Sequence, residues 1–371
     1  VFTGFKTNYK NAVFFNRGNL TLDGCAFANN TLGEDSDTIE FKAFIYNEGN
    51  LNIVNSEFYD NNIYHTYLVT SKSDIIINES TFENNTIDSW GRLINITNAN
   101  SAKIISTEFV ENTLGSGEVI SVERCNDVLI NAEFYDNTKG WGIFARNNSN
   151  LNIENSIFTG NSFSRILETR NNVQNSISGC TFSNNTVNYI VLSEDKNLSV
   201  SESSFLANTL SDNPRSGESA LFIGSDVNAS VNGCVFAENK GGDCRNIYSE
   251  NPNVNITHTT FDTENVDYAV SDIDYGKTET INGTIDIGTN FDFNVNLNIN
   301  NKVYPVKVTN NKFTYTLSNL TGGEYEVVLN PEDNNSNTFV FDKITKTFAV
   351  NRIDPGLKVT ISNITQGEKL E

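Results

Sequence analysis

The sequence predicts an all-β protein: a right-handed parallel β-helix of about 11 coils with three strands per coil, followed by a smaller β-sandwich. The phrase NLNIVNSEFYDNN at 50–62 returns almost unchanged as NLNIENSIFTGN at 150–161. A Phe recurs every 22–31 residues, and an Asn follows it by three positions in nearly every unit. After about residue 275 this repeat stops, and apolar residues alternate with polar ones instead.

The recurring Phe is the anchor of each repeat unit, and the other positions are counted from it. A small residue lies two positions before the anchor, and an aliphatic residue such as Ile153 or Leu129 lies five positions before it. The Asn three positions after the anchor is present in every unit from Asn8 to Asn239, and only the last unit has Glu264 instead. The anchors are Phe5, Phe27, Phe58, Phe82, Phe109, Phe134, Phe158, Phe182, Phe205, Phe236 and Phe261.

The spacing within a unit predicts strands joined by corners. Apolar residues seven and five positions before the Phe are two apart, which is strand periodicity, and so are the small residue and the Phe. The step between these two pairs is three, so both pairs point inward only if the chain turns between them. Gly, Asn, Ser or Glu fill most of these corners, as turn chemistry expects. A third apolar run, such as LINI at 93–96, completes each unit.

Such units form a parallel β-helix when each coil pairs with the next at a spacing of about 4.8 Å. Parallel crossovers are right-handed as a rule. We expect the Phe rings to stack inside the coils. The recurring Asn is expected to take the left-handed conformation of a tight corner and to bond its amide to the coils on either side.

We predict three segments: a β-helix over 1–275, an immunoglobulin-like sandwich over 276–353, and the start of a second such repeat over 354–371. The alternation after residue 276 is broken by NN and GG pairs, which favour hairpin turns. The first coil lacks its leading strand and the last repeat stops early, so we expect the sequence to be part of a longer protein.

The combination resembles the large adhesin-like surface proteins of methanogenic archaea. The resemblance rests on repeats of NLxIxNSxFxxN, with FxxN units such as FANN, FENN and FSNN, followed by an immunoglobulin-like repeat. Chlamydial polymorphic outer-membrane proteins also have FxxN repeats, but their GGA[ILV] partner motif is missing here. The archaeal resemblance implies an exported, surface-displayed rod that mediates attachment, without naming its ligand or any catalytic residue.

Composition limits the possible partners. The 371 residues have a formal net charge of −21, which argues against nucleic acid and against anionic membrane as partners. No run of about 18 apolar residues suggests a membrane span, so we expect no membrane contact within this segment. We expect an extracellular location at the cell surface, with a carbohydrate or a surface protein of a neighbouring cell as partner.

We predict that the protein is not an enzyme, although many β-helices cleave polysaccharides. The NTD, DD, GHG and RIK motifs of polygalacturonases are missing. His258 falls in a corner position and is expected to be a turn residue. Carboxylate pairs occur at EDSD (34–37) and SDIDYG (271–276), but no D-x-D-x-D-G calcium loop is present. We therefore expect no cofactor, with calcium left open, and no catalytic or metal site.

The five Cys are expected to be buried thiols, because three of them occupy the small inward position. Cys180 and Cys234 are two coils apart, roughly 9–10 Å, which is too far for a disulfide. Cys234 and Cys244 form the one pair close enough in sequence to bond, and the sequence leaves their state open.

For ligand contact we predict an aromatic strip at the turn before the third strand. Trp90 and Trp141 would lie about 10 Å apart, two coils from each other, and could stack on sugar rings. The alternative is that the rings fold inward and plug the corner. The strip consists of Trp90, Trp141, Tyr64, Phe163 and Tyr189.

Modification and loop contacts are further candidates. N-x-[ST] acceptors for glycosylation occur two residues after an anchor at Asn29, Asn84 and Asn184, facing solvent at one corner. Chance occurrence in an Asn- and Thr-rich chain is the alternative. The two longest coils add loops at 31–40 and 209–219, which are candidate contact surfaces or simply solvated loops.

Three functions therefore remain open. The leading one is a non-catalytic surface adhesin or stalk that attaches to glycans or to neighbouring cells. The second is a structural envelope or spacer protein without a specific ligand. The third is a polysaccharide-active enzyme.

Overall fold

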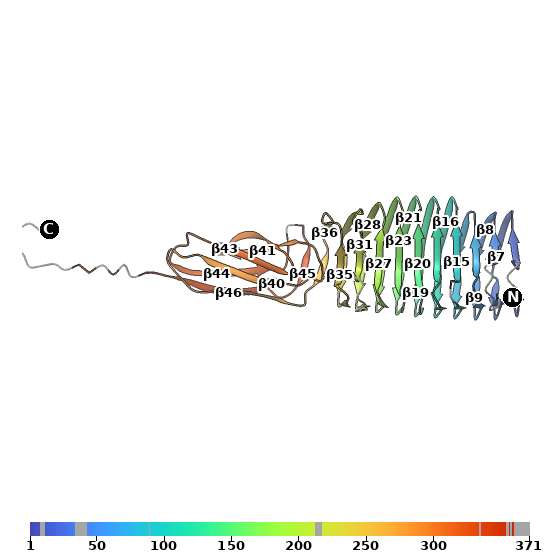
Figure 1. The fold of residues 1–371 in the computed structure, drawn as a ribbon, viewed down its shortest axis with the longest axis horizontal. Helices are drawn as coiled ribbons and strands as arrows, with labels where there is room; N and C mark the ends of the chain where they lie inside the picture. The colour runs from blue at the N-terminus through green and yellow to red at the C-terminus, as the bar shows by residue number, and fades with distance from the viewer. Residues whose placement is uncertain are drawn as a thin grey trace, which may run out of the picture.

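The computed structural model shows a rod of stacked coils with a smaller two-sheet domain following it along the long axis (Figure 1). The structure describes residues 1–7, 12–33, 43–88, 90–211, 217–333, 335–353, 356, 358 and 359. Asn8, the EDSD run at 34–37, most of the loop at 31–40, part of the loop at 209–219 and nearly all of 354–371 lie outside the described residues.

Each coil follows the predicted order of strands. A lead strand enters the corner, a Phe strand carries the anchor, and both lie in one long sheet of parallel pairs. The lead strands are β4 (Asn19–Asp23), β8 (Asn50–Val54), β12 (Ile75–Asn78), β21 (Asn150–Glu154), β24 (Gln174–Ser178), β28 (Asn197–Ser201), β32 (Asn228–Asn232) and β36 (Asn255–Thr257). The Phe strands are β1 (Phe2–Thr3), β5 (Ala26–Ala28), β9 (Glu57–Tyr59), β13 (Thr81–Glu83), β22 (Ile157–Thr159), β25 (Thr181–Ser183), β29 (Ser204–Leu206), β33 (Val235–Ala237) and β37 (Thr260–Asp262).

In two coils the lead and Phe strands merge into β16 (Ser101–Val110) and β19 (Asp127–Tyr135). The pairing of these strands shifts by one residue after Ile105, because β19 has no extra residue at the corner. The inward residues of β19 are therefore Ile130, Ala132 and Phe134, each two apart, and Ile130 replaces the predicted Leu129.

A short strand, which the sequence pattern did not reveal, follows the Asn in most coils. In most of these strands the inward residue is apolar and buried, as Ile63 and Leu114 are, whereas Lys240 and Gly241 are exposed. The short strands are β2 (Lys6–Thr7), β6 (Thr31–Leu32), β10 (Asn62–Ile63), β14 (Thr86–Ile87), β17 (Thr113–Leu114), β26 (Thr186–Val187), β30 (Thr209–Leu210) and β34 (Lys240–Gly241).

The predicted third strand of each coil forms a separate ten-stranded parallel sheet. Its strands are β3 (Phe14–Asn16), β7 (Ala43–Asn47), β11 (Tyr67–Ser71), β15 (Arg92–Thr97), β18 (Glu118–Glu123), β20 (Trp141–Arg146), β23 (Arg165–Arg170), β27 (Tyr189–Glu194), β31 (Ser219–Ile223) and β35 (Cys244–Ser249). Three groups of sheets thus run along the rod, but most coils have four strands rather than the predicted three, because of the short strand after the Asn.

The anchor rings stack along the core, as the repeat predicts. Successive rings from Phe27 to Phe261 are buried, with ring centroids 4.5–5.4 Å apart. The first coil is the exception, because Phe2 pairs with Phe27 and stacks on it at 4.9 Å. Phe5 is 39% exposed, so the prediction that it is an anchor is wrong.

The Asn three positions after each anchor forms a buried ladder, as predicted. Each side-chain Nδ2 donates to the Oδ1 of the next Asn at 2.8–3.1 Å, and that Oδ1 also accepts a backbone N–H from the preceding coil. The Asn ladder consists of Asn30, Asn61, Asn85, Asn112, Asn137, Asn161, Asn185, Asn208 and Asn239.

The left-handed corner residue is the one before each ladder Asn, which corrects the predicted role of the ladder. Asn29, Asp60 and Glu111 have φ of 56°, 54° and 53°, whereas no ladder Asn has a positive φ. The ladder position therefore requires Asn for its amide, which both donates and accepts, rather than for its backbone. A second corner, three residues before the anchor, is also left-handed at His258 (φ 52°), which confirms that residue as a turn residue.

The C-terminal domain contains two sheets. Antiparallel pairing joins β38, β40 and β43 in one sheet; the other has the order β39-β46-β44-β41-β42. The NN turns at 300–301 and 310–311 have positive φ, in agreement with the predicted hairpins. The elements are β38 (Val266–Ala269), β39 (Ile273–Asp274), β40 (Glu279–Ile285), β41 (Phe293–Ile299), β42 (Lys302–Val308), β43 (Lys312–Leu317), β44 (Gly323–Asn330), β45 (Thr338–Val340) and β46 (Ile344–Asn351).

The strands of this domain begin earlier than the predicted boundary at residue 276, because β38 and β39 pair with β40 and β46. Buried Tyr268 of β38 donates its hydroxyl to the carbonyl of Val327 in β44 at 2.7 Å and so links the two sheets. The immunoglobulin-like character of the domain stays a prediction.

Candidate functional site: the outer face of the ten-stranded sheet

The outer face of the ten-stranded sheet, here called the sheet face, combines aromatic and charged side chains in two columns that follow the rod. Strand register brings together residues from successive coils. The first column is Tyr67, Arg92, Glu118, Trp141, Arg165 and Tyr189. The second column is Phe15, Tyr46, Thr70, Asn95, Ser121, Phe144, Glu168, Leu192, Phe222 and Tyr248.

Each cation of the first column lies beside a ring, and Glu118 lies between Arg92 and Trp141. The guanidinium of Arg165 lies 5.2 Å from the ring centre of Trp141 and 5.8 Å from that of Tyr189, a cation–π arrangement on both sides. Arg92 lies 5.3 Å from the Tyr67 ring and its Nε is 2.5 Å from Glu118. Burial raises the pKa of the Tyr67 hydroxyl, an effect that Arg92 opposes. The pairing fixes long side chains in place and leaves a rigid, half-polar surface.

The second column provides two further groups of rings. Near the N-terminal end, Phe15 and Tyr46 stack at 5.5 Å, with the cation of Arg17 4.9 Å from the Phe15 ring centre. Toward the other end, Phe222 and Tyr248 stack at 5.6 Å. Phe15 is 52% exposed and therefore far more accessible than Tyr189 and Phe222, which are 7% and 8% exposed.

Side chains from both columns meet around Glu168. This carboxylate is 1% exposed, forms an ion pair with Arg165, and lies 2.6 Å from Nε of Arg170. Two guanidinium groups thus satisfy one buried carboxylate, the kind of charge-assisted pairing that holds geometry. The nearby Trp141 and Phe144 rings pack at 5.7 Å, so cations and rings form one continuous group.

The structure corrects the predicted aromatic strip. Trp141 and Tyr189 share the first column, two coils apart, with Arg165 between them. Trp90 is 70% exposed, but it does not belong to this column. The residue of its coil that is in register with the column is Arg92, two positions later. Tyr64, 37% exposed, precedes Tyr67 by three. The five residues therefore do not form one strip.

Phe163 does not belong to an exposed surface at all. It is 4% exposed and lies in the core. In neighbouring coils the same place is filled by the inward residue of the short strand. Gly142 allows the close packing here, because a Cβ at that position would lie 2.5 Å from the Ile166 carbonyl oxygen and 3.2 Å from the Phe163 ring. For this ring the inward alternative was correct. Tyr189 is also largely buried, at 7%.

Counting from the anchor failed for the strip because the coils differ in length at this turn. The distance from anchor to column residue is nine for Tyr67 and seven for Trp141, so equal counts do not mean equal register. The charged members were missed for the same reason. The recurrence of Arg and Glu at the start of third strands, as in GRLINI and SGEVIS, was the available signal.

The three predicted acceptors of glycosylation lie at one corner and are exposed. Asn29, Asn84 and Asn184 have φ of 56°, 50° and 55°, and each precedes a buried ladder Asn. The side chain of Asn84 donates to Asp60 at 2.6 Å. Their modification stays a prediction.

Neither His has the surroundings of a catalytic base. His65 Nε2 lies 3.5 Å from Asp88, and His258 Nδ1 lies 3.3 Å from Asn232. No nucleophilic side chain completes either pair through a hydrogen bond in the part of the chain that the structure describes. The absence of catalysis nevertheless stays a prediction, because an active site could use carboxylates alone.

One recess of the rod gathers several carboxylates. It is lined by Glu194, Asp195, Asp226 and Glu250 together with Lys196. Asp195 is 3% exposed and accepts hydrogen bonds from Asn172, Asn175 and Ser193, so its lone pairs already have partners. Asp195 is the last residue of a second ladder of buried side chains, which also contains Asn148 and Asn172.

All five Cys are free thiols, and all but half-buried Cys25 are buried. Cys234 and Cys244 are therefore unpaired in this structure. Burial raises the pKa of Cys180 and Cys234 to about 11. Among the described residues, no three His, Cys, Asp or Glu side chains come together in a way that could hold a metal ion. In the same residues no helix has the length and apolar character needed to cross a membrane.

Comparison with known protein families agrees with this architecture. A family described as the right handed beta helix region matches residues 118–285, from β18 to the end of β40. The chain is a parallel β-helix repeat protein. The family's description agrees with the right-handed path predicted for the coils. No curated protein matches the chain.

Proposed function

We propose that this β-helix is a non-catalytic, adhesin-like rod displayed on the cell surface, and that its sheet face contacts glycans or the surface of a neighbouring cell. The observation that carries this proposal is the continuous group of rings and guanidinium groups along one face. Rigid aromatic rings offer broad, half-apolar surface on which sugars stack, and guanidinium groups add directed donors.

The geometry of the rod supports an attachment role. Successive coils repeat at about 4.8 Å, so the columns present their groups at regular intervals along an extended surface. A polymer of sugars could contact several coils at once, and many weak contacts along one chain add to a useful affinity. The resemblance to adhesin-like surface proteins of methanogenic archaea, with immunoglobulin-like repeats, supports this proposal, and the proposal includes an extracellular location.

The experiment compares glycan-array and whole-cell binding of the parent protein with that of two variants. Trp141→Ala removes a ring from the first column, and Trp90→Ala, the matched control, removes an exposed ring outside both columns. We expect Trp141→Ala to weaken binding at least tenfold and Trp90→Ala to leave it unchanged. Circular dichroism confirms that both variants keep the fold.

Other outcomes favour the alternatives. Equal binding by both variants would place the contact outside the sheet face. If the parent protein binds no glycan and no cell, the role of a structural spacer or envelope component is favoured. The close docking of the C-terminal domain on the rod, where β45 pairs with β37, is compatible with such a role. Release of oligosaccharides from acidic polysaccharides would favour an enzyme.

A further inference from the structure

A segment of the C-terminal domain copies the pattern of a coil. In the repeat, NSEF at 55–58 places a left-handed corner at Asn55, a small polar residue at Ser56 and the anchor at Phe58. Near the C-terminal domain's end, SNTF at 336–339 has the same order. Ser336 has φ of 60°, compared with 49° at Asn55.

The backbone of this segment pairs with the last coil as a coil would. Strand β45 lies parallel to β37, with Phe339 in register with Phe261. The N–H of Thr338 donates to the carbonyl of Thr259 at 2.9 Å. Within the rod, Thr81 donates to Ser56 in the same relative position at the same distance. The pairing therefore continues the rod by one further rung.

The small residues two positions before each anchor, such as Ser56, form a column along the rod, here called the small polar column. The side chain of Asn337 makes the same bonds as this column. Its Oδ1 accepts the N–H of Thr259 at 2.9 Å, and its Nδ2 donates to the carbonyl of Ile256 at 3.1 Å. Ser56 does the same in the rod: it accepts the N–H of Cys25 and donates to the carbonyl of Leu22. Asn337 is 5% exposed, so these bonds are made in the interior.

The ring of Phe339 extends the anchor stack. It is 1% exposed and lies 6.4 Å from Phe261, and Phe293 of β41 packs on it at 5.2 Å. The core of the rod thus passes into the core of the C-terminal domain without a break.

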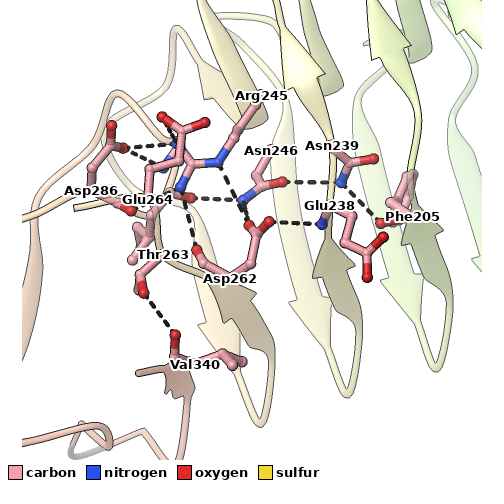
Figure 2. A network of polar contacts seen from close by, with 12 residues as sticks. Phe205, Glu238, Asn239, Arg245, Asn246, Asp262, Thr263, Glu264, Asp286 and Val340 are labelled. Atoms are coloured by element: carbon pink, nitrogen blue, oxygen red, sulfur yellow. Dashed lines mark hydrogen bonds and ion pairs between the residues drawn. The ribbon is translucent and has the colours of Figure 1, made fainter. Parts of the chain in front are cut away.

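A second set of contacts ends the Asn ladder at the same junction (Figure 2). The last coil has Glu264 where an Asn would continue the ladder, and Asn239 donates instead to Asn246 at 3.1 Å. Asn246 in turn donates to the carbonyl of Ile287, in the C-terminal domain, at 2.8 Å. Arg245, 6% exposed, lies 3.1 Å from Asp286 and 3.5 Å from the Glu264 carboxylate (Figure 2).

We propose that residues 335–340 are a coil mimic, a segment of the C-terminal domain that caps the rod by completing its backbone pairing, its polar column and its ring stack. The end of a β-helix otherwise presents unpaired backbone groups and apolar side chains to water, and terminal repeats need a cap. The last coil is then protected only while the C-terminal domain is docked. The docked domain also covers the strand edge at the end of the rod, so strands of other molecules cannot pair with it.

Hydrogen exchange followed by mass spectrometry on the whole chain tests the proposal. Asn337→Ala removes both polar-column bonds and leaves the C-terminal domain's sheets untouched. We expect exchange in residues 255–262 to accelerate about tenfold, while residues 128–135 in the middle of the rod stay unchanged. The matched control is Thr316→Ala at an exposed position of β43, which should change neither region.

A second variant, Phe339→Ala, removes the ring that joins the two cores and should accelerate exchange in 255–262 further. Unchanged protection of 255–262 in both variants would overturn the proposal. So would equal acceleration in 128–135, because that result would indicate general destabilisation rather than loss of a cap. If Phe339→Ala unfolds the C-terminal domain and 255–262 stay protected, the last coil needs no cap and the proposal is wrong.

Discussion

The Asn ladder makes a quantitative prediction at Asn137, in the middle of the rod. Its Nδ2 donates to the carbonyl of Phe109 at 2.8 Å and to Oδ1 of Asn161 at 2.9 Å. Its Oδ1 accepts the N–H of Asn112 at 3.0 Å and Nδ2 of the same residue at 2.9 Å. Asn137→Ala removes these four bonds and leaves the buried N–H of Asn112 without its partner. Oδ1 of Asn161 still accepts the backbone N–H of residue 137, and Nδ2 of Asn112 still donates to the carbonyl of Phe82.

Each such bond contributes about 1 kcal/mol net, so we expect Asn137→Ala to lower the free energy of unfolding by about 4 kcal/mol. This is more than the loss of one polar pairing, because the amide is bonded through both of its polar atoms. Urea unfolding followed by circular dichroism measures the change. Asn152→Ala, in an outward-facing position of β21, is the control and should change stability by less than about 0.5 kcal/mol.

The ladder also predicts coupling between neighbours. Asn137 and Asn161 share one side-chain bond, so the cost of the double variant should fall short of the summed single costs by about 1 kcal/mol. A loss below about 1 kcal/mol for Asn137→Ala, or strict additivity in the double variant, would refute the argument that the amides act as one connected ladder.

Three further predictions follow from the core and the surface. Phe134→Ala removes a ring held between Phe109 and Phe158 at 4.8 and 4.5 Å, and should cost about 3–5 kcal/mol in urea unfolding; a loss under about 1 kcal/mol would contradict the stacked core. Because burial raises the pKa of Cys180 and Cys234 to about 11, both thiols should resist a thiolate-selective reagent at pH 8 in the folded protein and react in urea; rapid reaction of the folded protein would count against this. Native material should exceed the mass of the bare polypeptide if Asn29, Asn84 and Asn184 carry glycans, and an equal mass would rule the modification out.

Stability should also depend on pH through these two thiols. Their pKa rises from 9.0 to about 11 on folding, so below pH 9 both states are protonated and the thiols contribute no pH dependence. As the pH rises from about 9 to about 11, the unfolded state loses its protons first, and the free energy of unfolding falls.

The local pattern of the sequence was sufficient for most parts of the fold that repeat, although it did not reveal the short strand after the ladder Asn. Inward residues lie two apart on a strand, and each coil must match its neighbour, so the Phe stack, the small polar column and the Asn ladder could all be read from spacing. Each coil has two left-handed corners, and only the one at the ladder was misplaced. It was assigned to the ladder Asn, whereas the residue before that Asn has the positive φ. A buried amide and a left-handed turn both favour Asn, and composition alone does not distinguish these two reasons.

The tertiary structure decided what lies between the repeating positions and at the ends of the rod. Turns of unequal length place Arg92 in register with Trp141 and leave Trp90 outside, because register is set by backbone pairing between coils and not by distance from the anchor. In the first coil, pairing with Phe27 selects Phe2 over Phe5. The cap joins Asn337 to Thr259 across 78 positions, a contact that no local period can indicate, since it forms only when the C-terminal domain folds against the open end of the rod.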